Sequence, residues 1–419
     1  MRHPLFTIPE RFHNGTPIGI TSVCSAHPIV IEAALRLAKD NGRQVLIEAT
    51  CNQVNQDGGY TGMTPADFRQ FVDDLATNVG IDPDQIIYGG DHLGPNPWKH
   101  LPADEAMAKA EAMIAAFAKA GFTKLHLDTS MGCRDEPVAL ADQLTAERAA
   151  RLASAAEAHK QSNLPPVYII GTEVPVPGGA LEELDHVEIT SPAAVAETYW
   201  VHKEAFERGG LEDAFSRVIG LVVQPGVEFG HSDVIHFKPE KARDLSASLR
   251  SMPGIIFEAH STDYQTDDAL RDLIRSGFCI LKVGPWLTFA LREALYALDG
   301  LADVLECHAP RGTLMTKMEE VMMDQPDNWK KYYAGDEMEL WLQRHFSYSD
   351  RIRYHWPAEK AQAAVSELRS RLEGKKLTEP LLSQFLPKIA DVGTDIDMDQ
   401  MLIAAVQNIL RTYDQATAS

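Results

Sequence analysis

The strongest constraint on the fold is a repeated alternation of short, apolar segments with longer amphipathic ones. Segments such as VYIIG, GLVVQ and CILKV have uninterrupted apolar middles, which is typical of parallel strands covered on both faces. Eight strands are expected, at residues 18–24, 44–51, 86–92, 124–130, 167–174, 218–225, 255–261 and 278–285. Helices are expected between and after them, at residues 27–41, 64–79, 103–120, 145–159, 192–208, 239–250, 266–275 and 287–298.

Eight strand–helix units predict an α/β fold, a TIM (β/α)8 barrel over residues 1–308. An open, doubly wound sheet is the competing architecture. It is less favoured because no GxGxxG follows the first strand and because polar residues cluster at the strand ends. Beyond residue 308 the alternation stops. Residues 309–419 are expected to form a mostly helical C-terminal extension packed on the barrel, with helices at 329–345 and 357–372.

Charge and cysteine usage narrow the setting in which the chain works. The formal net charge of -21 repels nucleic-acid phosphates and anionic membranes, so neither is expected as a partner. No apolar stretch approaches the length of a membrane span, and the N-terminus lacks the apolar run of a signal peptide. The five cysteines are scattered without a CxxC pair, which argues against a thiolate zinc site and for a reducing, cytoplasmic environment.

Polar residues gather at the C-terminal strand ends, where barrels of this kind carry out chemistry. His92 and His260 belong to the third and seventh strand ends and are flanked by acidic residues. Imidazole nitrogen and carboxylate oxygen suit a divalent metal, zinc best, with manganese or magnesium as alternatives. Glu173 and His231 are the next candidate ligands. The competing interpretation is that each histidine is only hydrogen-bonded at its strand end.

Substrate contacts are expected from the same rim and from a late basic cluster. The candidates are Asn52, Gln53, Gln224, Asp263, Lys282, Arg351 and Arg353. Glycine-rich turns after several strands could hold phosphate through backbone N–H groups, although turn formation alone explains each of them. The P-loop, GxSxG and HExxH motifs are absent, so a P-loop kinase is not expected. A Schiff base on Lys282 is a less favoured alternative to metal chemistry.

Several longer strings carry a family resemblance. They are SVCSAHPIVIEAAL (22–35), IEATCNQVNQDGGYTGMTPADF (47–68), GGDHLGPN (89–96), IGTEVPVPGG (170–179), VVQPGVEFGHS (222–232), EAHSTDYQT (258–266), LKVGPWLTFALREA (281–294) and SDRIRYHWP (349–357). On these strings the chain resembles the larger, non-catalytic subunits of bacterial tagatose-1,6-bisphosphate aldolase, of galactitol and N-acetylgalactosamine breakdown. Two mild departures are Cys51, where members usually carry serine, and Asp128-Thr129-Ser130, where they often carry DAS.

The resemblance implies a fold similar to that of class II, zinc-dependent aldolases. In those enzymes an Asp-His pair ends the third strand, with the aspartate as proton donor and the histidine as ligand, and Asp91-His92 fit that place. His231, or alternatively Gln224, and His260 would supply ligands from the sixth and seventh strands. The class II glycine-rich phosphate loop is not clearly kept after the sixth strand.

The resemblance also implies two functions. Members are labelled accessory aldolase subunits, tagatose-6-phosphate kinases, which this sequence does not support, or D-tagatose 6-phosphate 4-epimerases. We expect a metal-dependent 4-epimerase that interconverts D-tagatose 6-phosphate and D-fructose 6-phosphate by retro-aldol cleavage, with Glu173 or Asp128 as the second acid/base beside Asp91. The alternative is an accessory or chaperone subunit of a smaller catalytic aldolase chain, which predicts an apolar patch on the extension. A homo-oligomer is an open alternative.

Overall fold

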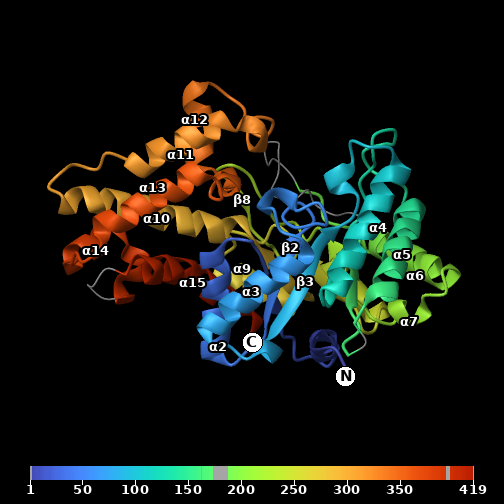
Figure 1. Cartoon of the computed structure of the whole chain (residues 1–419). Helices are drawn as coiled ribbons and strands as arrows, with labels where there is room; N and C mark the ends of the chain where they lie inside the picture. The colour runs from blue at the N-terminus through green and yellow to red at the C-terminus, as the bar shows by residue number, and fades with distance from the viewer. Residues whose placement is uncertain (1, 162, 173–186, 393–396, 419) are drawn as a thin grey trace.

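Eight parallel strands close into a barrel in the computed structural model, which describes residues 2–161, 163–172, 187–392 and 397–418 (Figure 1). The barrel strands are β1 (Ile20–Cys24), β2 (Val45–Thr50), β3 (Ile86–Leu93), β4 (Lys124–Leu127), β5 (Val167–Ile170), β6 (Val218–Val223), β9 (Ile256–Ala259) and β10 (Phe278–Val283). Each strand pairs with the next in the chain, and β10 pairs with β1. Each of the eight overlaps a predicted strand, so the barrel prediction is confirmed. A two-stranded antiparallel sheet, β7 (Glu228–Phe229) with β8 (Val234–Ile235), follows β6 and was not predicted.

Helices surround the barrel and build the extension. They are α1 (Thr7–His13), α2 (Pro28–Asn41), α3 (Pro65–Val79), α4 (Ala103–Lys119), α5 (Asp142–His159), α6 (Pro192–Arg208), α7 (Glu212–Phe215), α8 (Arg243–Ser248), α9 (Asp267–Arg275), α10 (Pro285–Leu305), α11 (Thr313–Asp324), α12 (Glu337–Phe346), α13 (Glu359–Leu372), α14 (Glu379–Phe385) and α15 (Met398–Thr417). Short 3-10 helices include η2 (Gly59–Thr61), η6 (Pro326–Asn328), η7 (Arg351–His355) and η8 (Pro387–Val392). None of the described helices combines the length and apolar character that a membrane span requires.

Local signals explain where several of these helices begin. At α3 the side chain of Thr64 accepts a hydrogen bond from the backbone of Asp67, and the Asp67 carboxylate accepts one from the backbone of Thr64, which satisfies two orphan N–H groups. The predicted helix at 329–345 is wrong in its first half, because a loop follows η6 and occupies residues 329–336. Helix α12 begins only after Asp336, which forms a second capping box with Glu339. The predicted helix at 239–250 is also shorter, with α8 spanning six residues.

The C-terminal extension both projects from the barrel and completes it. Figure 1 shows α10 to α14 extending to one side of the barrel, while α15 runs back toward α2 and α9. Helix α15 packs against α2, α9, α10 and strand β1. The last helix of the chain therefore lies in the ring of helices around the barrel, and η7 of the extension reaches the C-terminal strand ends.

The barrel interior changes character along its axis. At the N-terminal strand ends it is filled by apolar side chains such as Leu46, Ile256 and Ile280. Two residues further along the same strands, and on the same face because strand side chains alternate, lie Glu48, Glu258 and Lys282. The upper barrel is therefore an ionic layer, and it supports the candidate site.

Candidate active site

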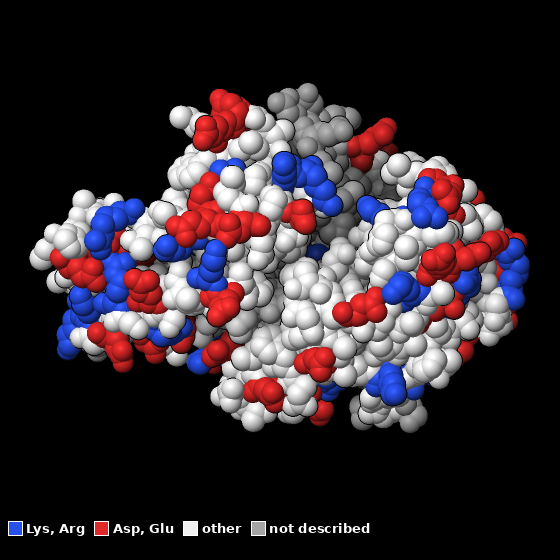
Figure 2. Space-filling view, turned by 45° about the horizontal axis from the view of Figure 1, so that its top comes forward, with Lys and Arg blue, Asp and Glu red and all other residues white. Residues whose placement is uncertain are grey.

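A pocket of about 310 Å³ opens at the C-terminal strand ends, between the barrel and the extension. In Figure 2 the surface is hollowed where these two parts meet, with Lys or Arg side chains at the edge of the hollow. Eight of the sequence-predicted site residues line this pocket. They are Asn52, Gln53, Asp91, His92, His260, Asp263, Lys282 and Arg353. The extension adds Tyr354 and Trp356, so the pocket is not made by the barrel alone.

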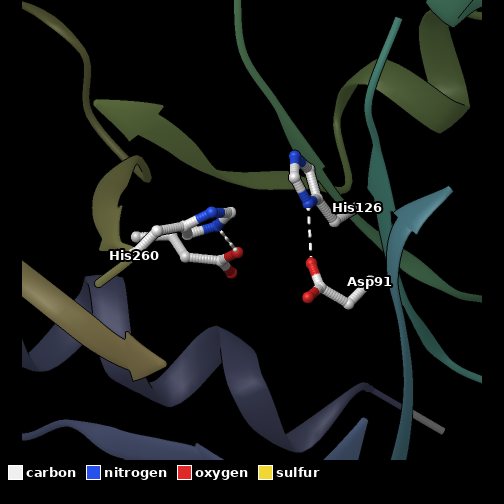
Figure 3. Close-up of side chains that lie close together, drawn as sticks. Asp91, His126 and His260 are labelled. Carbon is white, nitrogen blue, oxygen red and sulfur yellow. Dashed lines mark hydrogen bonds and ion pairs between the residues drawn. The ribbon is translucent and has the colours of Figure 1, made fainter. Parts of the chain in front are cut away.

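Three imidazole rings meet at the base of this pocket. The ring centroids of His92 and His260 are 4.9 Å apart, and those of His126 lie 5.1 Å from His92 and 5.2 Å from His260. His126 lies within β4 and was missed by the sequence analysis. The sequence KLHLD did indicate it, because side chains along a strand point to alternate faces and His126 therefore shares the inward face of Lys124. Figure 3 shows Asp91 and His126 pointing toward each other, with His260 across from them.

Each imidazole has a carboxylate partner. His92 Nδ1 lies 2.7 Å from Asp128 Oδ2, and His126 Nδ1 lies 3.0 Å from Asp91 Oδ1. His260 Nε2 lies 2.9 Å from Glu258 Oε1. Carboxylate partners of this kind fix the ring orientation and the tautomer of metal-binding histidines. Histidines that are only hydrogen-bonded would make the same contacts, and the two interpretations differ in the atoms that these contacts leave unused.

Among the described residues, one buried nitrogen of the histidine cluster is left without a partner. His126 Nε2 has no hydrogen-bond partner in the described structure. Burial would raise the pKa of Asp91, but His92, Lys282 and His126 hold it well below its usual range, so Asp91 is a carboxylate. His126 Nδ1 lies 3.0 Å from Asp91 Oδ1 and 3.2 Å from the backbone N of His92, and it donates to Asp91 only in the tautomer that carries the proton on Nδ1. In that tautomer the lone pair of Nε2 is unused, although buried polar atoms are normally satisfied. A bound cation would satisfy it.

The protonation states also fit a metal. Burial lowers the pKa of His126, and burial together with the Lys282 charge lowers that of His260 well below its usual range. Both rings are therefore neutral at neutral pH, which is the form that binds metal ions. The side chains of Asp91, His126, Glu258 and His260 offer ligand atoms within 4.8 Å of one another. This donor set of imidazole nitrogen and carboxylate oxygen fits zinc, and also manganese.

A network of buried charges lies beneath the histidines. Lys124 Nζ lies 2.7 Å from Glu48 Oε1 and 2.6 Å from Glu258 Oε2, and none of these side chains is exposed. Lys282 Nζ pairs with Asp91 Oδ1 and lies 3.8 Å from Glu258 Oε1. Burial favours a neutral amine, but Asp91 outweighs it and raises the pKa of Lys282. A charged ammonium is a poor nucleophile, so the Schiff-base alternative is disfavoured.

Four other predicted site residues lie outside the pocket lining. Asp128 binds His92 through one carboxylate oxygen and Ser130 through the other. Gln224 accepts hydrogen bonds from the turn that follows it. His231 donates to or accepts from Ser347 of the extension, and Arg351 lies over the ring of Tyr332.

The structure therefore does not bring His231 or Gln224 to the histidine cluster. The hairpin of β7 and β8 turns His231 toward the extension, where its ring also meets Tyr333. The Gln224 side-chain oxygen is used by the backbone N–H groups of Gly226 and Val227. Glu173 lies outside the described residues.

Nearly the whole chain is similar to proteins of one family. Residues 5–418 match the family model described as D-tagatose-1,6-bisphosphate aldolase subunit GatZ/KbaZ-like. A D-tagatose 6-phosphate 4-epimerase of Agrobacterium fabrum (strain C58 / ATCC 33970) is 53% identical over 408 residues, covering 96% of each chain. The D-tagatose-1,6-bisphosphate aldolase subunit GatZ of Klebsiella pneumoniae subsp. pneumoniae is 48% identical over 418 residues, covering 98% of this chain and 99% of that protein. A crystal structure of a probable tagatose 6 phosphate kinase from Sinorhizobium meliloti 1021 is 57% identical with a TM-score of 0.87, covering 95% of this chain and 100% of that one.

Proposed function

The chain belongs to the D-tagatose-1,6-bisphosphate aldolase subunit GatZ/KbaZ-like family, and from this premise we propose that it is a metal-dependent 4-epimerase that interconverts D-tagatose 6-phosphate and D-fructose 6-phosphate. The observation that carries the proposal is the triad of His92, His126 and His260 beside Asp91 in a pocket large enough for a hexose phosphate. A purely structural subunit has no need for buried, mutually perturbed acids and imidazoles. The relative at 53% identity carries the same activity in its name.

His126 and His260, which belong to the buried donor group, and His92, whose ring lies against both of theirs, are the residues that would hold the metal ion. Zinc is the best match to this donor set, with manganese or magnesium as alternatives. When bound, the ion would polarise the ketose oxygens as a Lewis acid. Asp128 orients His92, since both of its carboxylate oxygens are engaged by neighbouring side chains. We therefore assign Asp128 to positioning and keep Glu173 as the proposed second acid/base.

Asp91 would move the proton that the reaction requires. In the retro-aldol route its carboxylate accepts the proton of the C4 hydroxyl as the C3–C4 bond breaks, giving a three-carbon enediolate and glyceraldehyde 3-phosphate. The aldehyde turns its other face, the bond re-forms, and Asp91 returns the proton to the C4 oxygen. Lys282, paired with Asp91, holds a positive charge beside the developing negative charge. Asn52 and Gln53 line the same pocket and would bind substrate hydroxyls.

The proposal is tested with the isolated chain. Fructose 6-phosphate is incubated with the purified protein and zinc, manganese or magnesium, and tagatose 6-phosphate is measured by NMR. A His92→Ala, His260→Ala double variant should lose both metal and activity while remaining folded. Retention of stoichiometric metal by this variant would remove the metal assignment and return both histidines to hydrogen-bonded structural residues. Glyceraldehyde 3-phosphate captured by a coupled dehydrogenase during turnover would support the retro-aldol route.

A second function is favoured by one surface feature. On α12 the side chains of Met338, Trp341, Leu342 and Phe346 are 71%, 36%, 44% and 42% exposed. Their spacing places them along one stripe of the helix. Such a stripe fits the alternative of an accessory subunit that stabilises the smaller catalytic subunit of D-tagatose-1,6-bisphosphate aldolase, and the relative at 48% identity is named as an aldolase subunit.

Co-expression with the smaller aldolase chain separates the two functions. Stabilisation of that chain without any epimerase activity favours the accessory role. The two roles can coexist, because the α12 stripe is carried by residues that do not line the pocket. We place either activity in the cytoplasm, consistent with five cysteines that are all free thiols.

A further inference from the structure

The usual phosphate site of a (β/α)8 barrel is filled here by the protein itself. In such barrels phosphate is frequently held by the loops after strands seven and eight and by a helix N-terminus. In this chain the loop after β9 brings Asp263 to the N-terminus of α10. Asp263 Oδ1 accepts hydrogen bonds from Gly284 N at 3.1 Å and from Trp286 N at 2.8 Å. A phosphate at that place would compete with a buried carboxylate for the same donors.

The C-terminal extension brings a positively charged side chain to the wall of the pocket. Arg353 lies on η7 and lines the pocket wall. Its Nη1 donates to the backbone oxygens of Ser349 and Asp350, and its Nη2 donates to Tyr354 Oη at 2.9 Å. None of these partners is a carboxylate. Within the described part of the chain, no carboxylate oxygen lies at ion-pair distance from Arg353, and its hydrogen bonds go to backbone oxygens and to Tyr354.

Two other enclosed arginines have carboxylate partners, whereas Arg351 donates to the backbone oxygen of Asn328 and lies over the ring of Tyr332. Arg148 pairs with Glu136 at 2.5 Å, and Arg292 pairs with Asp350 at 3.1 Å. Asp350 and Asp263 act on Arg353 through their charges, but Asp350 is paired with Arg292 and Asp263 with the N–H groups of α10, so neither contacts the guanidinium. A partly buried guanidinium that no carboxylate contacts is costly. An anionic ligand would offset that cost, and guanidinium suits phosphate because it offers several N–H donors in one plane.

We propose that Arg353 binds the phosphate of the ketohexose phosphate, and that Asp263 keeps this phosphate away from the N-terminus of α10. This inference rests on the proposed function and deepens it. The substrate then lies with its phosphate against η7 of the extension and its carbonyl end toward the triad of histidines. The extension thus selects phosphorylated over free sugars.

Equilibrium binding tests this without requiring turnover. Isothermal titration with fructose 6-phosphate, and with inorganic phosphate, is compared for the wild type and Arg353→Met. Loss of charge-assisted hydrogen bonds should weaken binding of both probes by about 10- to 100-fold. Binding of free fructose should not change. Arg369→Met is the matched control, because Arg369 is an exposed arginine of the extension that pairs with Asp399.

Two outcomes would overturn the inference. One is an Arg353→Met variant that binds inorganic phosphate as tightly as the wild type does, including the case in which only Arg351→Met loses phosphate affinity. Circular dichroism verifies that both variants are folded. The other concerns Asp263→Asn, which keeps an acceptor oxygen for α10 and removes the charge. This variant should bind inorganic phosphate at least as tightly as the wild type, and binding weakened about tenfold or more, a cost of about 1.4 kcal/mol, would contradict the role given to Asp263. If the chain proves inactive as an epimerase, these binding results still decide the placement of the phosphate.

Discussion

Replacing Lys124 by methionine should destabilise the protein strongly, because it removes the cation that pairs with two fully buried carboxylates. Lys124 Nζ lies 2.7 Å from Glu48 Oε1 and 2.6 Å from Glu258 Oε2, and all three side chains have 0% exposure. Methionine has a similar length, so the change removes the charge with little change in packing. The effect on the free energy of unfolding is therefore an electrostatic one.

Two independent estimates give the same loss in the free energy of unfolding. Removing one partner of a buried ion pair typically costs about 3–5 kcal/mol. The protein could instead bind a proton on a buried carboxyl. With an ordinary glutamate pKa near 4.3 and about 1.36 kcal/mol per pH unit, holding that proton at pH 7 costs about 3.7 kcal/mol. We therefore expect a loss of about 4 kcal/mol at pH 7, which shrinks by about 1.4 kcal/mol for each pH unit toward pH 5.

Urea unfolding at pH 7 and pH 5 measures this loss. Lys109→Met is the matched control, because Lys109 forms a surface pair with Asp57 at 2.9 Å and its side chain is 42% exposed. Such pairs contribute about 0–1 kcal/mol. If Lys124→Met were destabilised no more than Lys109→Met, the upper barrel would not be an ionic layer, and the electrostatic account of Asp91 and Lys282 above it would fail.

Three further predictions follow from the site and its surroundings. His126→Ala should weaken metal binding by more than about tenfold, since even partners of ligands contribute about 10- to 100-fold. Metal content after dialysis measures it, with the exposed His159→Ala as control; equal metal content in both would exclude His126 as a ligand. Trp341→Glu should leave epimerase activity unchanged and abolish stabilisation of the smaller aldolase chain in co-expression, whereas unchanged stabilisation would place the interface elsewhere. Burial raises the pKa of Asp263 to about 6. A carboxyl whose pKa is raised in the folded state stabilises that state at low pH, and this stabilisation is lost as the pH rises. The free energy of unfolding of the wild type should therefore fall by about 2–3 kcal/mol relative to that of Asp263→Asn between about pH 4 and pH 7. A pH-independent difference in urea unfolding would contradict this.

The barrel could be predicted from the sequence because each strand is covered on both faces. Its residues then read as short continuous apolar runs, and eight such runs with helices between them leave few alternatives. The first half of the helix expected at 329–345 failed because the apolar and aromatic residues there pack in a loop. Trp329 and Tyr333 are both buried without a helix, and the chain turns at Gly335, whose φ is 124°.

The site was only partly predictable because it depends on which way side chains point. His126 was missed since a histidine inside an apolar strand looks like any other strand residue until the barrel places its face inward. His231 is close to a strand end in sequence, but the hairpin after β6 directs it to Ser347. Arg351 and Arg353 are two residues apart on a 3-10 helix with three residues per turn, so they face different sides. Only Arg353 lines the pocket.

Metal add-back on the purified chain tests the central claim most directly. The protein is stripped with a chelator and returned to zinc, manganese or magnesium in D₂O, with fructose 6-phosphate as substrate. The account predicts tagatose 6-phosphate only after metal is restored, with the hydrogen at C4 retained, because retro-aldol cleavage breaks the C3–C4 bond and leaves the C4–H bond intact. Absence of tagatose 6-phosphate with every metal, or replacement of the C4 hydrogen by deuterium, would contradict it.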